Sequence, residues 1–142
     1  MSSGFPVPFD CSPVRVWELP NLVRAGFPSP AEDLGAKRID VLERLVIHPQ
    51  ATFTMGVRGD SMIEFKIFDG DVILVDRAIK ERHGHIVVAV LDNEFLIKQL
   101  YKRGSVIKLK SGNPTFPDIV PKEGQTLSIW GVVITSITRF AY

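Results

Sequence analysis

From about residue 52 onward, hydrophobic and polar positions alternate in the manner of β-strands. Phe53, Met55 and Val57, for example, are separated by small or polar residues, which is the period-two pattern of a half-buried strand. Five further segments share this character: residues 71–76, 85–91, 95–101, 105–110 and 126–138. Glycine or proline separates most of them, and no helical pattern intervenes. The pattern predicts a mainly β fold, a single compact antiparallel β domain with a tight turn at Asp92-Asn93.

The N-terminal part of the chain lacks this alternation. Its first 28 residues contain five prolines, Pro6, Pro8, Pro13, Pro20 and Pro28. Prolines at this density disfavour both helix interiors and sheet ladders. We therefore predict a flexible, extended N-terminal arm over residues 1–28, with at most one helical turn around Val16–Leu19. The β-rich domain is predicted to occupy residues 29–142.

Two short helices are predicted between the arm and the first strand. Ser29-Pro30-Ala31-Glu32 has the form of a capping box with proline at the first helical position. Asp40, followed three residues later by Glu43, is a second capped helix start, and His48-Pro49 ends that helix. The fold should therefore contain one or two short helices beside its sheet.

Charge and cysteine content narrow the possible environments. The net charge is +1, which offers no electrostatic footprint for nucleic acid or an anionic membrane. Cys11 is the only cysteine, so an internal disulfide is impossible and a reducing compartment suits the chain. No apolar stretch approaches the ~20 residues that cross a bilayer. We expect a cytoplasmic protein without a membrane anchor and without direct, specific DNA binding.

Lys98 occupies an unusual position for a lysine. Strand alternation places it between Leu96 and Leu100 on one face, while the other face is also largely apolar. Burial would lower the pKa of the ammonium and leave a neutral amine able to accept a proton. From the pattern alone, a lysine that snorkels to solvent at a sheet edge is the more ordinary interpretation.

Ser61 lies in Gly59-Asp60-Ser61-Met62, directly after the first predicted strand. A glycine-led bend could expose the hydroxyl and aim the backbone N–H groups of Asp60 and Ser61 at an oxyanion. The alternative is an ordinary turn in which Ser or Asp caps a helical turn.

The sequence gives less support to a histidine-based active site or to a metal site. The chain has three histidines, His48, His83 and His85, and nothing in the pattern pairs one with Ser61. His83-Gly84-His85 is not completed by carboxylates or cysteines at ligand spacing. We therefore expect neither a classical triad nor a metal or other cofactor.

Taken together, several motifs resemble the UmuD-like branch of the LexA-type family of Ser-Lys self-cleaving proteins. The matching segments, in the family's order and spacing, are Ala25–Ala31, Arg38–Asp40, His48-Pro49, Gly59–Met62, Asp69–Asp71 and Phe95–Lys98. The resemblance extends from about Val23 to the C-terminus and implies the β fold of the family's C-terminal domain.

The resemblance also implies roles for individual residues. Ser61 would be the nucleophile, Lys98 the general base, and Ala25-Gly26 the bond that is cut. Two small residues at that bond allow close approach of the backbone, and glycine tolerates strained dihedrals. One departure is that the family often has two lysines in the base strand where this chain has Lys98-Gln99; the first lysine is the catalytic one, so the role is retained.

The implied biology is that of the SOS response. Members of this branch cut themselves when a RecA filament on single-stranded DNA stimulates them, act as homodimers, and then join a UmuC-type catalytic subunit of an error-prone translesion polymerase. Repressor members carry a helix-turn-helix domain before the cut, and only 25 residues precede Gly26 here. We therefore expect a polymerase subunit and keep three alternatives: a LexA-type repressor fragment, a signal-peptidase-like enzyme, and a binding module in which Ser61 and Lys98 are structural.

Overall fold

The computed structural model describes residues 7–8, 15–18, 23, 25–26 and 37–141. Contacts divide the chain into two units, one made of Met1–Phe9 with Ile47–Tyr142 and the other of Asp10–Val46. The boundary expected at residue 28 lies outside the described residues, so the division into an arm and a β-rich domain stays a prediction.

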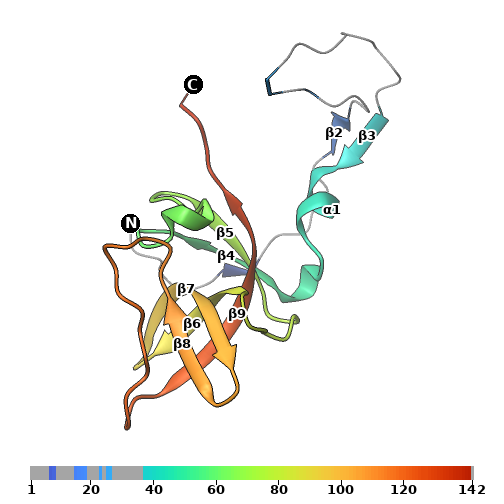
Figure 1. Cartoon of the computed structure of the whole chain (residues 1–142). Coiled ribbons are helices and arrows are strands. Elements are labelled where there is room, and N and C mark those ends of the chain that lie inside the picture. The colour runs from blue at the N-terminus through green and yellow to red at the C-terminus, as the bar shows by residue number, and fades with distance from the viewer. Residues whose placement is uncertain (1–6, 9–14, 19–22, 24, 27–36, 142) are drawn as a thin grey trace. The chain divides into compact units, whose positions relative to one another are not determined.

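The larger unit is built on one antiparallel sheet. Its strands are β1 (Val7–Pro8), β4 (Thr52–Gly56), β5 (Val72–Asp76), β6 (Ile86–Leu91), β7 (Glu94–Arg103), β8 (Val106–Lys110) and β9 (Leu127–Ile137). Their order is β1-β4-β5-β9-β6-β7-β8, and Figure 1 shows β9 running through the sheet between its two halves. The mainly β, antiparallel fold predicted from alternation is confirmed.

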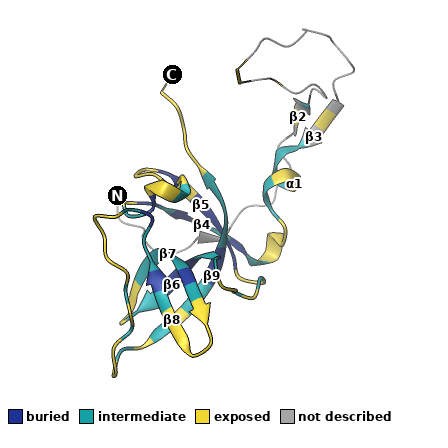
Figure 2. Cartoon of the chain, in the orientation of Figure 1, coloured by how far each residue is buried: buried dark blue, intermediate teal, exposed yellow. Residues whose placement is uncertain are grey.

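The strand positions agree with the alternation because each segment buries one or both of its faces. β5 and β6 are the most buried strands, with Leu74 and Val88 fully inaccessible to solvent (Figure 2). The turn between β6 and β7 is the predicted Asp92-Asn93 pair, with φ values of 49° and 66°. Positive φ at both central residues is the signature of a type I′ hairpin turn, which matches the twist of the strands.

Strand β9 carries two irregularities that divide the core. Its pairing shifts register against β5 at Leu74/Val75 and against β6 at Val88/Ala89. One buried cluster lies around Ile73, Val75 and Met55, and a second lies around Leu100 and Leu109. The bulges allow one long strand to contribute residues to both clusters, because a bulge bends a strand and increases its twist.

The smaller unit contains β2 (Arg15–Glu18), β3 (Lys37–Asp40) and α1 (Val41–Leu45). The helical turn predicted around Val16–Leu19 is wrong, because β2 pairs with β3 in an antiparallel ladder. The helix start at Asp40 is confirmed, since its carboxylate accepts a hydrogen bond from the Leu42 amide at 3.0 Å. The Ser29–Glu32 capping box lies outside the described residues.

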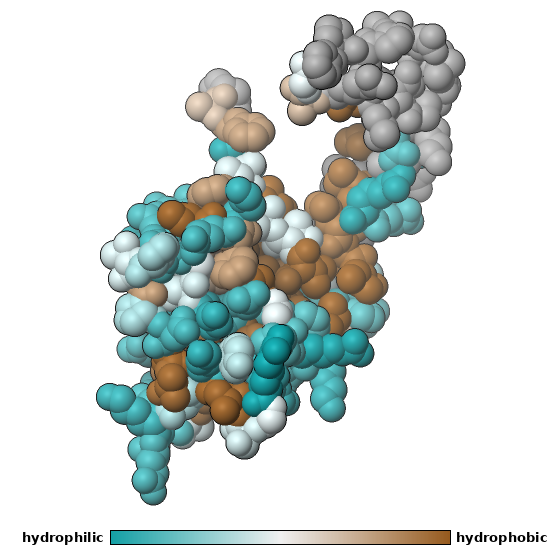
Figure 3. Space-filling model, viewed as in Figure 1, coloured by the Kyte–Doolittle hydropathy of each residue, from teal (hydrophilic) through white to brown (hydrophobic). Residues whose placement is uncertain are grey.

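Two 3₁₀ turns, η1 (Pro49–Ala51) and η2 (Ile63–Phe65), flank β4. In the part of the chain that the structure describes, no helix is long and apolar enough to cross a membrane. On the face shown in Figure 3, hydrophilic and hydrophobic side chains are interspersed over the sheet. Some apolar residues, such as Val106 and Val120, are exposed, which is usual for a protein surface.

Candidate active site

The loop that carries Ser61 leaves β4 and is fixed at its base by backbone hydrogen bonds. The Val57 amide donates to the Asp71 carbonyl, and the Gly70 amide donates to the Val57 carbonyl, both at 2.9 Å. Gly59 has φ +93°, a conformation that suits glycine, and its amide donates to the Asp69 carboxylate at 2.7 Å. The loop is therefore a defined structure from which Ser61 projects.

A buried carboxylate anchors the same loop to the sheet. Asp71 is 2% exposed, and its carboxylate accepts from the Phe68 amide at 2.9 Å and from the Ser136 hydroxyl of β9 at 3.0 Å. A buried carboxylate is stable only when such donors satisfy it. Asp71 thus ties the end of the serine loop to the central strand.

The segment after β8 clamps the serine loop from the other side. The Gly112 amide donates to the Ser61 carbonyl at 2.6 Å, and the Gly112 carbonyl accepts from the Glu64 amide at 2.8 Å. The Asn113 side chain donates to the Asp60 carbonyl at 2.9 Å. Sequence reasoning missed this clamp, because no local pattern indicates that residues so far apart in the sequence, such as Asp60 and Asn113, meet.

These contacts occupy the carbonyls at Asp60 and Ser61 and leave their amides available. Among the described residues, neither amide donates a backbone hydrogen bond, whereas the Gly59 amide is held by Asp69. Free N–H groups beside a serine hydroxyl are the donors that an oxyanion requires.

Lys98 lies in β7, which is flanked by β6 and β8. The residue is 7% exposed, and burial lowers the pKa of its amine below the usual value for lysine. The amine lies 5.9 Å from the centre of the Phe116 ring. The lysine is thus buried in an interior strand, and it does not reach solvent at a sheet edge.

Ser61 and Lys98 meet in one pocket of about 130 Å³. Its lining comes from β4, the serine loop, β6 and β7, and includes Met55, Met62, Val88 and Ile97. Within the described part of the chain, no hydrogen bond joins the Ser61 hydroxyl to the Lys98 amine. Catalytic hydrogen bonds are often long before a substrate is in place, so the shared pocket is the relevant observation.

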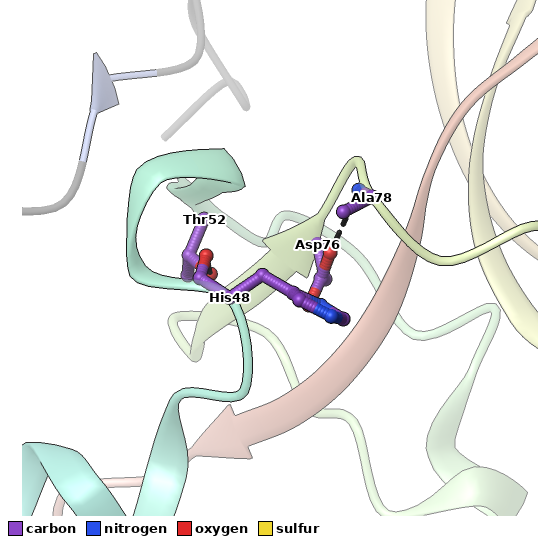
Figure 4. A network of polar contacts seen from close by, with 4 residues as sticks. All are labelled: His48, Thr52, Asp76 and Ala78. Carbon is purple, nitrogen blue, oxygen red and sulfur yellow. Dashed lines mark hydrogen bonds and ion pairs between the residues drawn. The ribbon is translucent and has the colours of Figure 1, made fainter.

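The histidines lie elsewhere, and none of them lines this pocket. His48 Nδ1 lies 2.7 Å from the fully buried Asp76 carboxylate, which also accepts from the Ala78 amide (Figure 4). The hydroxyl beside this pair belongs to Thr52 and donates to the His48 carbonyl, not to the ring. The His48-Asp76 pair therefore has a structural role: it connects the segment just before β4 to the end of β5.

Ala25 and Gly26 lie in the smaller unit, in the chain between β2 and β3, and both are exposed. An added Cβ at Gly26 would meet no atom within 4 Å. Among the described residues, no cluster of three or more His, Cys, Asp or Glu side chains could hold a metal ion.

An antiparallel sheet whose pocket joins a serine hydroxyl to a buried lysine is the kind of site that some serine peptidases use. The family model described as Peptidase S24-like matches residues 18–134, and the chain belongs to this family. It is therefore a serine peptidase by family.

Similar proteins agree with this assignment. The protein MucA of Salmonella typhimurium is 40% identical over 116 residues, which cover 81% of this chain and 79% of MucA. The protein ImpA of the same organism is 38% identical over 117 residues, or 82% and 79% of the two chains. A LexA repressor of Dechloromonas aromatica is 42% identical over 94 residues, which cover 66% of this chain and 47% of the repressor. The resemblance to UmuD-like proteins is confirmed, and these relatives support a self-cleaving protease of the LexA/UmuD type.

Proposed function

We propose that this chain cuts itself once, between Ala25 and Gly26, and that Ser61 and Lys98 carry out the reaction. The observation that carries the proposal is the pocket that Ser61 shares with a buried Lys98. A neutral amine at pH 7 requires a lowered pKa, and burial of Lys98 supplies it.

The proposed reaction begins when Lys98 takes the Ser61 hydroxyl proton and the oxygen attacks the Ala25 carbonyl carbon. The Asp60 and Ser61 amides, which other backbone groups do not use, stabilise the oxyanion. The Lys98 ammonium then gives its proton to the Gly26 nitrogen as the peptide bond breaks. Water hydrolyses the Ala25 ester and regenerates Ser61.

The biological role that we propose is in SOS mutagenesis. A RecA filament on single-stranded DNA would favour the conformation in which the scissile bond enters the pocket, as a population shift that adds no catalytic group. Residues 26–142 would then act as a homodimeric accessory subunit of a UmuC-type translesion polymerase in the cytoplasm. The UmuD-like relatives support this setting.

The test is to incubate the purified full-length chain with RecA, single-stranded DNA and a nucleoside triphosphate, and to read the products by mass spectrometry. We expect a new N-terminus at Gly26, and its loss in Ser61→Ala and Lys98→Ala. Matched controls are Ser105→Ala and Lys102→Ala, which change an exposed serine and an exposed lysine of the β7–β8 hairpin. Normal processing in either active-site variant would refute the assignment. Cleavage of an added signal peptide instead would favour a signal-peptidase-like enzyme.

A further inference from the structure

Ser111, at the end of β8, has a buried hydroxyl for which the described part of the chain provides no hydrogen-bond partner. Buried hydroxyls are normally bonded, and leaving one without a partner costs about 1–3 kcal/mol. Because this hydroxyl lowers the stability of the fold, we looked for a functional reason for a serine at this position.

Ser111 directly follows the last residue of β8 that pairs with the lysine strand. The β7–β8 ladder pairs Leu100 with Leu109 and ends at Gln99 opposite Lys110. Ser111 is the next residue, and the same register continued by one step would set it opposite Lys98. Because side chains alternate along strands, both residues point to the face of the Leu100–Leu109 pair. Directly opposed residues have their Cβ atoms roughly 4.5–5.5 Å apart, which brings a serine hydroxyl within reach of a lysine side chain.

The same segment leads directly to the nucleophile. Gly112, the residue after Ser111, donates its amide to the Ser61 carbonyl at 2.6 Å. Phe116, a few residues further on, lies beside the Lys98 amine. Ser111 therefore sits at the point where the chain passes from the lysine strand to the serine loop.

We propose that the Ser111 hydroxyl is a positioning group for Lys98, accepting one N–H of the amine so that the nitrogen lone pair points at the Ser61 hydroxyl. This inference rests on the self-cleavage proposed above. A neutral amine has two N–H groups and one lone pair, so fixing one N–H removes most of its rotational freedom. When the Ser61 proton moves to Lys98, the ammonium keeps its N–H on Ser111, and the new proton is the one passed to Gly26.

The effect of removing the hydroxyl has a definite sign. An oxygen that accepts from an ammonium favours the charged form, so Ser111→Ala should move the pH midpoint of self-cleavage downward. The plateau rate should still fall, by about 10- to 100-fold, because the base loses its orientation. Arg58 is the other charged residue lining the pocket. It is the same in the wild type and in Ser111→Ala, so it does not account for a difference between their midpoints.

The experiment measures self-cleavage of the full chain without RecA from pH 6 to pH 10. Ser111→Ala should be slower and have the lower midpoint than the wild type. Ser111→Thr, which retains a hydroxyl, should recover most of the rate, and Ser105→Ala is the matched exposed control. In the inactive Ser61→Ala background, NMR titration of the Lys98 amine should show the same downward shift when Ser111 is also replaced.

The outcomes separate this inference from the proposed function. Cleavage by Ser61→Ala would overturn both. Ser111→Ala cleaving within twofold of the wild type, while Ser61→Ala is inactive, would overturn the role of Ser111 alone. Slow cleavage with an unchanged midpoint would assign Ser111 a structural role and also overturn the inference.

Discussion

Replacement of Gly112 by alanine should damage the serine loop in a way that can be worked out from the structure. An ideal Cβ at this position would lie 2.4 Å and 2.8 Å from two ring carbons of Phe65 and 3.2 Å from the Met62 Cα atom. Since ordinary contact begins at 3.4 Å, the ring must move by about 1 Å and the Met62 backbone by a few tenths of an ångström. Ser61 immediately precedes Met62, so the displacement reaches the nucleophile.

Two magnitudes follow from this geometry. Overpacking of a buried site costs about 1–3 kcal/mol of folding free energy. A misplacement of about 1 Å at a catalytic group can cost ~100-fold in rate. The backbone next to Ser61 moves by less than this, so Gly112→Ala should unfold at lower urea concentration and cleave itself up to about 10-fold more slowly, although it alters no side chain with a proposed chemical role.

A second substitution tests whether the steric explanation is correct. Phe65→Leu shortens the side chain that the new methyl group meets, so the double variant should regain part of both the stability and the cleavage rate. Recovery should be incomplete, because the contact with the Met62 backbone remains. Urea titration and a cleavage time course on the four proteins of this cycle measure the coupling. Wild-type cleavage by Gly112→Ala, or additive effects in the double variant, would refute the reasoning.

Three further predictions concern buried ionisable groups. Burial lowers the pKa of Lys98 in the folded chain, so between that pKa and the unfolded value the unfolded chain binds more protons and stability rises with pH. Lys98→Met should accordingly melt a few degrees above the wild type at pH 7, with the difference shrinking toward pH 10 in calorimetric scans. Asp71→Ala removes the oxygen that accepts from both the Phe68 amide and the Ser136 hydroxyl, and should lose about 1–3 kcal/mol in urea titrations because these donors are left unpaired. His48→Ala leaves buried Asp76 short of a partner and should lose a similar amount while self-cleavage stays within twofold, a result that a His-based triad would not give.

Local sequence patterns predicted most of the strands because each strand buries a face of its own. Alternation indicated β4 through β9, and Asp92-Asn93 marked its turn by residue type alone. The capped start at Asp40 was equally local, since donor and acceptor are two residues apart. Features that depend on neighbouring residues in the chain could thus be predicted without the structure.

Features that depend on distant partners could not. The segment around Val16 forms a strand because Lys37–Asp40 pairs with it. The sequence around Val16 contains no pattern that predicts this pairing. The Gly112 clamp and the His48-Asp76 pair likewise join residues from separate elements. For Lys98, the sequence pattern was compatible both with burial and with a side chain that reaches solvent. The structure shows that the residue is buried, because β7 lies between β6 and β8.

The meeting of Ser61 and Lys98 in one pocket requires a strongly bent sheet. Ser61 follows β4 and Lys98 lies in β7, which is four strand positions away; in a flat sheet these strands would be roughly 19 Å apart. The register shifts on β9 fall at Trp130 and Ile134, which have no partner in the ladders. The Trp130 ring then packs against Phe53 of β4 at 5.2 Å and against Phe95 of β7 at 6.0 Å between ring centres. One bulged residue on the last strand therefore packs against both halves of the sheet, so the candidate site depends on the C-terminal strand even though neither proposed catalytic residue belongs to it.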